Sequence, residues 1–261
     1  MGGYAFGHEW ELERERLALL EHIFDPGTIR HLTGAGVAPG WRCLEVGAGA
    51  GSIARWLCER AGPDGRVLAT DVETDFLEQL DVDGLEVRRH DIVAEELEEG
   101  AFDLIHARLV LEHLPERDLA LKRLAGALAP GGVMVIEDFD WSALVPAPCA
   151  EEELFERGHD AVLDLMQTKG YTPWYGRQLP GELRNRGLDD LGAEGWIGVG
   201  IGGTPAARWW RLTIARLSGD LVGRRQLSEG DLERWLDLHD DPSFCFHYPA
   251  LITAWGRRPA D

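Results

Sequence analysis

A glycine-rich segment directly after a short apolar run constrains most strongly how this chain folds. Residues 43–46 are followed by Gly47-Ala48-Gly49-Ala50-Gly51 and then by a helix-forming stretch at 52–60. A strand that turns sharply into a helix needs residues without a Cβ, and the first amides of that helix attract a carboxylate or a phosphate. The segment therefore predicts a ligand site where a buried strand meets a helix.

The alternation of short apolar runs and helical patterns continues along the chain. Strands are predicted at 42–46, 66–71, 85–90, 102–107 and 133–136, with helical patterns between most of them, for example at 116–128. Beyond Asp140, helices are predicted at 151–168, 177–187, 205–218 and 229–240, and strands at 194–201 and 244–255. This alternation is typical of a parallel α/β sheet with helices on both faces.

The regions before and after this sheet have other roles. Residues 8–24 form a predicted amphipathic helix with Trp10, Leu17, Leu20 and Phe24 on one face, and Asp25-Pro26-Gly27 is expected to end it and to let it move as a lid. We therefore divide one structural domain into an N-terminal helical cap (1–34), a ligand-binding core (35–140), and a helical lid or substrate-recognition region with the sheet-completing strands (141–261).

The charge of the chain limits its partners. There are 26 Lys and Arg against 46 Asp and Glu, a net charge of −20, which repels nucleic acid and anionic lipid. No apolar run is long enough to cross a bilayer, so we expect a cytoplasmic location and no membrane partner. A homodimer is possible. The four cysteines lack metal-ligand spacing and are expected to be free thiols.

Two details of the glycine segment indicate which ligand it takes. A dinucleotide fingerprint needs a third glycine or an alanine at position 52, which is Ser52. Glu45, two residues before Gly47, would repel a pyrophosphate but suits a ligand that carries an ammonium and a sulfonium.

The ordered set of segments resembles the class I S-adenosylmethionine-dependent methyltransferases, of the small-molecule, methyltransferase-domain type. Glu45-x-Gly47-x-Gly49-x-Gly51 is similar to their first motif. The later matching segments are Asp71 at the end of the second strand, His90-Asp91-Ile92, 102–108, Leu111-Glu112-His113-Leu114-Pro115 and Leu128-Ala129-Pro130-Gly131-Gly132. The match covers roughly 35–140 and implies a Rossmann-like, mostly parallel, seven-stranded sheet.

The resemblance also implies a cofactor site for S-adenosyl-L-methionine, with S-adenosyl-L-homocysteine as product. The residues expected to bind the cofactor are Glu45, Gly47, Gly49, Gly51, Asp71, Val72, Asp91, Ile92 and Arg108. Asp71 would accept hydrogen bonds from the ribose hydroxyls, and Asp91 would accept one from the adenine amino group. The alternatives are that Asp71 caps the turn before Thr74 and that Asp91 caps the segment that follows it.

His113 is the candidate general base, since an imidazole near neutral pH accepts a proton from a hydroxyl. Its alternative role is to bond a backbone carbonyl and shape the loop, and Glu112 is expected to point elsewhere. In the aromatic second half, Trp141, Trp174 and Tyr175 are the candidate substrate residues. The alternative for these rings is ordinary core packing.

These residues favour an enzyme that methylates a small organic acceptor, such as a secondary metabolite, with oxygen preferred over nitrogen or carbon. The alternatives are another reaction on the same fold (decarboxylation, hydroxylation or cyclisation) and a regulatory protein that binds the cofactor without turnover. We expect no metal. Only Glu137, Asp138 and Asp140 offer an acidic group for Mg²⁺, and that question stays open.

Overall fold

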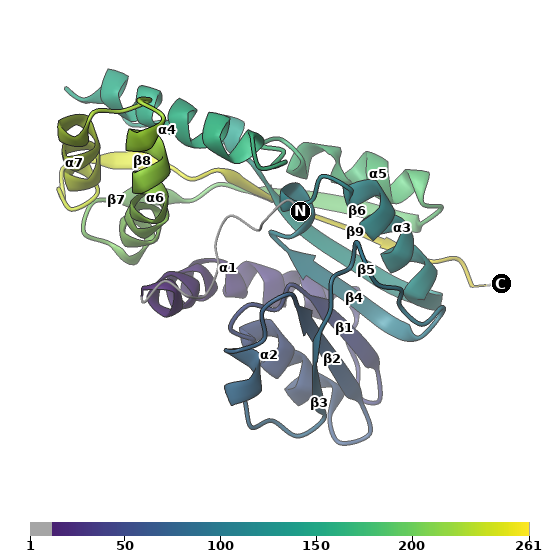
Figure 1. Cartoon of the computed structure of the whole chain (residues 1–261). Coiled ribbons are helices and arrows are strands. Elements are labelled where there is room, and N and C mark those ends of the chain that lie inside the picture. Colours follow the sequence, from purple (N-terminus) through teal and green to yellow (C-terminus); the bar gives the residue numbers. More distant parts are fainter. Residues whose placement is uncertain (1–11, 261) are drawn as a thin grey trace.

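The structure, a computed structural model, describes residues 12–260 and contains a seven-stranded sheet in the order β3-β2-β1-β4-β5-β9-β6 (Figure 1). The first five strands run parallel: β1 (Arg42–Val46), β2 (Arg66–Asp71), β3 (Leu85–Arg89), β4 (Phe102–Arg108) and β5 (Leu128–Asp140). The last strand, β9 (Ala250–Arg257), is antiparallel to both β5 and β6 (Asp189–Trp196). The predicted mostly parallel seven-stranded α/β sheet is confirmed.

Helices cover both faces of this sheet because successive strand residues point to opposite sides. Cys43, Val67 and Leu104 face α2 (Ser52–Ala61) and α1 (Glu13–Ala35), the helix that precedes the sheet. Leu44 and Ile105 face α3 (Arg117–Ala127) and α5 (Leu179–Asn185). Short 3₁₀ turns lie at Leu77–Gln79, Leu111–His113, Trp141–Ala143 and Gly176–Gln178.

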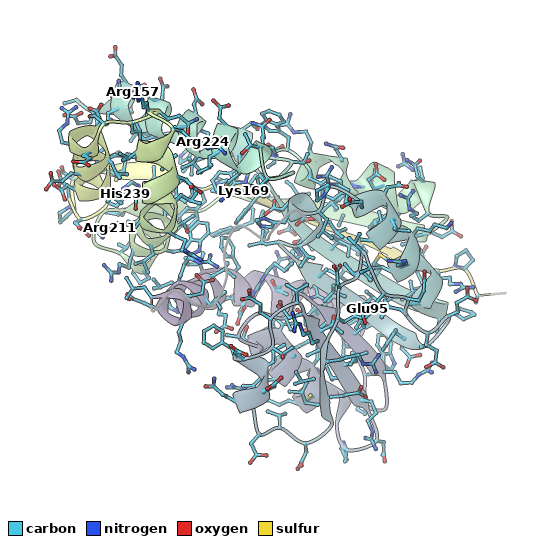
Figure 2. All side chains as sticks on the ribbon, viewed as in Figure 1. Glu95, Arg157, Lys169, Arg211, Arg224 and His239 are labelled. Atoms are coloured by element: carbon cyan, nitrogen blue, oxygen red, sulfur yellow. The ribbon has the colours of Figure 1, made fainter. Side chains whose placement is uncertain are left out.

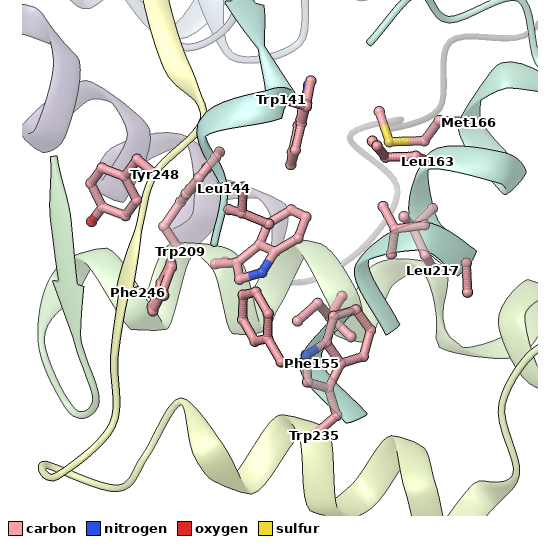
Figure 3. Packing of buried hydrophobic residues seen from close by; sticks show 14 of the residues in the cluster. Trp141, Leu144, Phe155, Leu163, Met166, Trp209, Leu217, Trp235, Phe246 and Tyr248 are labelled. Carbon is pink, nitrogen blue, oxygen red and sulfur yellow. The ribbon is translucent and has the colours of Figure 1, made fainter. Parts of the chain in front are cut away.

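A helical lobe built from the second half lies at one end of the sheet. It contains α4 (Glu152–Gln167), α6 (Pro205–Gly223), α7 (Glu229–Leu238) and a two-stranded sheet of β7 (Val199–Ile201) and β8 (Cys245–His247) (Figure 1). Its core is aromatic, with Phe155, Trp209, Trp235, Phe246 and Tyr248 packed together (Figure 3). Core packing therefore accounts for most rings of the second half.

The two strands predicted in the second half are each split between the sheets. Residues 194–201 are shared by β6 and β7, and residues 244–255 by β8 and β9. Pro249 has no N–H to continue a strand ladder. Opposite it, Gly198 has no room for a side chain, since a Cβ there would lie 2.4 Å from the Trp196 ring. At this point the chain passes from the main sheet to the lobe.

The N-terminal helix α1 (Glu13–Ala35) runs through Pro26, so the predicted break at Asp25-Pro26-Gly27 is wrong. Proline in a helix interior costs about 3 kcal/mol because it lacks a hydrogen-bond donor and its ring clashes with the preceding turn. Tertiary contacts on either side of it offset that cost: Phe24 is buried against Phe139, and Thr28 is buried beside Glu137. Residues 8–11, including Trp10, lie outside the described residues.

Several cations of the helical lobe, among them Lys169 and Arg211 (labelled in Figure 2), form ion pairs. Lys169 Nζ lies 3.0 Å from Asp220 Oδ2, and Arg211 Nε lies 2.9 Å from Asp240 Oδ2. All four cysteines are free thiols. Between residues 12 and 260, no helix has the length and apolar composition needed to span a membrane.

Candidate active site

The glycine segment forms the floor of the candidate site, between β1 and α2. Gly47, Gly49 and Gly51 all have left-handed φ angles, +65°, +57° and +88°. A Cβ at Gly47 would lie 2.4 Å from the Val110 side chain, but one at Gly49 would meet only Leu17, at 3.8 Å. The backbone of Gly49 is therefore the part of the loop that a ligand can approach closely.

A cavity of about 80 Å³ lies above this loop. Its walls come from α1, the segment after β4, the end of β5, α4 and α6, so the core and the helical lobe both contribute. Of the residues predicted from the sequence, Glu45, Gly47, Gly49, Arg108, His113 and Trp141 line it.

A buried histidine joins two carboxylates beneath the loop. His106 Nδ1 lies 2.7 Å from Glu45 Oε2, and its Nε2 lies 3.3 Å from Glu137 Oε2. Burial alone would lower the pKa of His106, but the charge of Glu45 and the hydrogen bond to Glu137 outweigh it and raise the pKa to about 9. His106 is thus an imidazolium at neutral pH and holds the Glu45 carboxylate at the cavity wall.

The other carboxylate of this network fixes α1 to the strand ends. Glu137 accepts hydrogen bonds from Thr28 Oγ1 at 2.5 Å and from Thr253 Oγ1 at 2.6 Å. Although burial opposes ionisation, the His106 hydrogen bond holds the pKa of Glu137 well below its usual range. Arg108 donates to Asp25 Oδ1 and Thr28 Oγ1, both at 2.8 Å. These contacts join α1 to β4, β5 and β9.

Helix α1 also reaches the start of α2. Glu21 Oε1 accepts from the Ser52 amide at 3.4 Å, at the helix N-terminus that the sequence analysis expected to attract an anion. Glu21 and Ser52 both line the cavity.

Glu112, His113 and Tyr171 also line the cavity. The carboxylate of Glu112 accepts from the Phe139 amide at 2.8 Å, and its Oε1 lies 3.7 Å from His113 Nε2. The Glu112 side chain therefore lines the cavity beside His113, and the expectation that it points elsewhere is wrong. The rings of His113 and Tyr171 pack with centroids 4.8 Å apart.

The acids predicted to bind the ribose and the adenine accept hydrogen bonds from backbone amides in this structure. Asp71 Oδ2 accepts from the Gly49 amide at 3.0 Å and its Oδ1 from the Glu73 amide at 3.1 Å. Asp91 Oδ1 accepts from the amides of Val93 and Ala94, which is the capping role weighed above. Neither residue lines the cavity, nor do Gly51, Val72 and Ile92. Their ligand roles stay predictions.

The structure brings only one of the three predicted substrate residues to the cavity. Trp141 lines it and donates from Nε1 to Tyr171 Oη. Trp174 is 42% exposed, and Tyr175 is buried in the core beneath α5, where the Arg117 guanidinium lies 5.4 Å from its ring. Neither Trp174 nor Tyr175 lines the cavity.

Several lining residues were not predicted from the sequence. They are Arg16, Leu20, Glu112, Phe139, Met166, Tyr171, Trp209 and Thr213. Only Glu112 carried a local signal, its place beside His113 in the Leu111–Pro115 motif. The others lie on α1, β5, α4, the segment after α4 and α6, which meet only through tertiary packing.

The acids considered for Mg²⁺ lie at the end of β5, which extends to Asp140, and they belong to separate networks. Glu137 joins the His106 network, Asp138 is fully buried, and Asp140 pairs with Arg177 at 2.5 Å. Within the described part of the chain, no cluster of three or more His, Cys, Asp or Glu is arranged to hold a metal ion.

The His106 network makes stability depend on pH in a specific direction. Because the folded pKa of about 9 exceeds that of a free imidazole, about 6.5, its stabilisation is complete below pH 6.5 and disappears as pH rises through 9. We expect His106→Gln to lower the free energy of unfolding by about 3 kcal/mol at pH 6, and by much less at pH 10. Urea unfolding across this range measures both values. His22→Gln, at an exposed site on α1, is the control, and a pH-independent difference would contradict the charged state of His106.

Comparisons with known proteins agree with this geometry. Residues 44–134 match the family described as "Methyltransferase domain". Methyltransferase str2 of Strobilurus tenacellus is 36% identical over 147 residues, 53% of this chain and 50% of that protein. The ubiquinone/menaquinone biosynthesis C-methyltransferase UbiE of Laribacter hongkongensis is 32% identical over 123 residues, 44% of this chain and 50% of that protein. The chain thus spans about half the length of these relatives.

Solved structures share the fold at low sequence identity. An S-adenosylmethionine-dependent methyltransferase from Aquifex aeolicus has a TM-score of 0.51 and 17% identity, covering 93% of this chain and 99% of that one. The [4+2]-cyclase SpnF also has a TM-score of 0.51, with 18% identity, covering 86% of this chain and 77% of that one. The sequence match is to a methyltransferase domain over residues 44–134, and the solved structures show that nearly the whole chain shares the fold of such proteins.

Proposed function

We propose that this chain is an enzyme that transfers the methyl group of S-adenosyl-L-methionine to a planar, hydroxylated small molecule. The observation that carries the proposal is the cavity itself. The open backbone of Gly49, the Glu45 carboxylate, Glu112, His113 and aromatic side chains all line it. At about 80 Å³ it is smaller than two whole reactants. We take it as the point where the reacting atoms meet, because holding two reactants in line is the main requirement of methyl transfer.

The residues of the loop fit the charge and shape of this cofactor. Glu45, held by the His106 imidazolium, offers a carboxylate to an ammonium or a sulfonium. Gly49 leaves room for close approach, and Asp71 lies 3.0 Å from its amide, where the carboxylate can also accept ribose hydroxyls. Asp91 would accept the adenine amine at the next strand end. When bound, S-adenosyl-L-methionine supplies an electrophilic methyl group and leaves as S-adenosyl-L-homocysteine.

The acceptor end favours a flat ring with polar groups. Phe139, Trp141 and Trp209 supply aromatic surface. Trp209 is 3% exposed, and its Nε1–H has no hydrogen-bond partner among the described residues. A buried donor without a partner costs free energy, so an oxygen of the acceptor would stabilise it. Oxygen is our preferred attacking atom, although the relative UbiE is named a C-methyltransferase.

A second candidate function uses the same cofactor for a reaction other than methylation. The cyclase SpnF has this fold, so the fold alone does not decide between methylation and another reaction, nor exclude a regulatory protein. We propose methylation because the cavity contains groups that can take a proton. We further propose a cytoplasmic, biosynthetic role and, from the net charge of −20, no nucleic-acid partner.

An acceptor panel with methyl-labelled cofactor tests the function. We expect planar hydroxylated compounds to gain one labelled methyl group, with one S-adenosylhomocysteine formed per product, as read by mass spectrometry. NMR of the product identifies the methylated atom. An altered acceptor without S-adenosylhomocysteine would instead indicate another reaction, and binding with no product would indicate a regulatory role.

Cofactor affinity should depend on Asp71 and Gly49. Asp71→Ala removes hydrogen bonds to a charged acceptor, each worth about 1.5–3 kcal/mol, and should weaken S-adenosylhomocysteine binding at least roughly tenfold. Gly49→Val places a branched side chain at a left-handed φ in the ligand's path and should abolish binding. Titration calorimetry measures both, with the exposed Asp75→Ala as control. Unchanged affinity in folded Asp71→Ala and Gly49→Val proteins would refute the cofactor site.

The acceptor side is tested through Trp209→Phe, which removes the N–H and keeps a ring. Losing one hydrogen bond, about 0.5–1.5 kcal/mol, should raise the acceptor KM about two- to tenfold and leave cofactor affinity unchanged. Trp210→Phe is the matched control, because its buried Nε1 also lacks a partner among residues 12–260 but does not line the cavity. An equal effect in both variants would assign the change to packing.

A further inference from the structure

Two groups from different parts of the chain hold the carboxylate of Glu112 in the cavity wall. Its Oε2 accepts from the Phe139 amide on β5 at 2.8 Å. The Tyr171 hydroxyl, beyond the end of α4, also hydrogen-bonds the carboxylate and itself accepts from Trp141 Nε1. With both partners donating to it, Glu112 is fixed in position while its side chain still lines the cavity.

Burial and the groups around Glu112 have opposing effects on its pKa. The titratable and charged groups around it are Asp138 on β5, Arg117 at the start of α3, Tyr171, Arg16 on α1 and His113 beside it. Burial raises the pKa of Glu112 to about 8, against the opposing hydrogen bonds from Phe139 and Tyr171. Asp138, buried next to it, has a pKa well above its usual range because of burial and the charge of Glu112.

The environment of His113 lowers its pKa, so that the uncharged form of this side chain is favoured. Burial and the charge of Arg16 lower its pKa to about 3, so the imidazole is neutral and is a weak proton acceptor at physiological pH. Of the two neighbours, the carboxylate is the stronger base when ionised. A general base works best with a pKa near the working pH, which favours Glu112.

We propose that Glu112 is the catalytic residue that removes the proton from the methyl acceptor, with Tyr171 and His113 as positioning residues. This inference rests on the proposed methyl transfer. The acceptor oxygen forms a bond to the methyl carbon as the carbon–sulfur bond breaks, and the sulfur keeps that electron pair. The O–H proton passes to the Glu112 carboxylate, which becomes a carboxylic acid and then releases the proton to water. The charges balance, because the sulfonium becomes a neutral thioether.

The pH dependence of turnover separates the two candidate bases. In the wild-type enzyme, kcat should rise with pH through about 8 as Glu112 ionises. Glu112→Gln, which keeps an acceptor for the Phe139 amide, should lower kcat by roughly 10²–10⁴, remove this rise and leave S-adenosylhomocysteine affinity intact. His113→Gln should lower kcat less and keep the rise. Glu156→Gln, on the exposed side of α4, is the control.

The opposite pattern would overturn the proposal: Glu112→Gln with more than a tenth of wild-type kcat, or an unchanged rise near pH 8. Glu112→Asp covers the case in which Glu112→Gln does not fold, since it should keep the rise at a lower kcat. An Asp variant that loses the rise would also contradict the assignment.

A readout without turnover separates this proposal from the proposed function. The infrared C=O band of protonated carboxyl groups should titrate near pH 8 in the wild-type protein and lose that component in Glu112→Gln. If the band is identical in both proteins, Glu112 is not the titrating acid. If it changes as expected but no acceptor is methylated, the proposed function fails and the assignment of Glu112 as its base fails with it.

Discussion

The imidazolium of His106 between Glu45 and Glu137 is the interaction on which the rest of the site depends. The Glu137 carboxylate is fully buried, and an isolated buried charge is very unfavourable, so its ionised form depends on the neighbouring imidazolium. The pair of acids comes from β1 and β5 and the cation from β4, so the network also fixes how these three neighbouring strands present their carboxyl ends. The glycine loop begins two residues after Glu45, so the network that fixes the end of β1 also fixes where the loop starts.

The same network explains why α1 tolerates a proline. Thr28 and Asp25 lie on either side of Pro26, and each bonds a group at the sheet edge, Glu137 or Arg108. The helix is therefore held on both sides of its weakest point. Its first half, with Leu17 and Glu21, forms a wall of the cavity, so the helix belongs to the scaffold of the site as much as to its cover.

The fold could be predicted from the sequence because its signals are local. Apolar runs bounded by glycine give the observed bounds of β1 and β2, and the Leu spacing indicates α3. The path of α1 could not be predicted, since the helix-breaking tendency of Pro26 is local and the contacts that override it are not. The residues of the site also fall into those that a local motif predicts and those that only tertiary packing brings together. Glu45, Gly49 and Arg108 follow from motifs, whereas Tyr171 and Trp209 reach the cavity only through packing of the lobe.

The place of β9 sets an order for assembly during synthesis. In the main sheet β6 pairs only with β9, which lies between β5 and β6. As the chain leaves the ribosome, strands β1–β5 and the glycine loop can associate first, but β6 must wait more than fifty residues for its neighbour. Until then the edge of β5 stays unpaired. The side of the cavity formed by the glycine loop can thus form early, and the side formed by the helical lobe forms last.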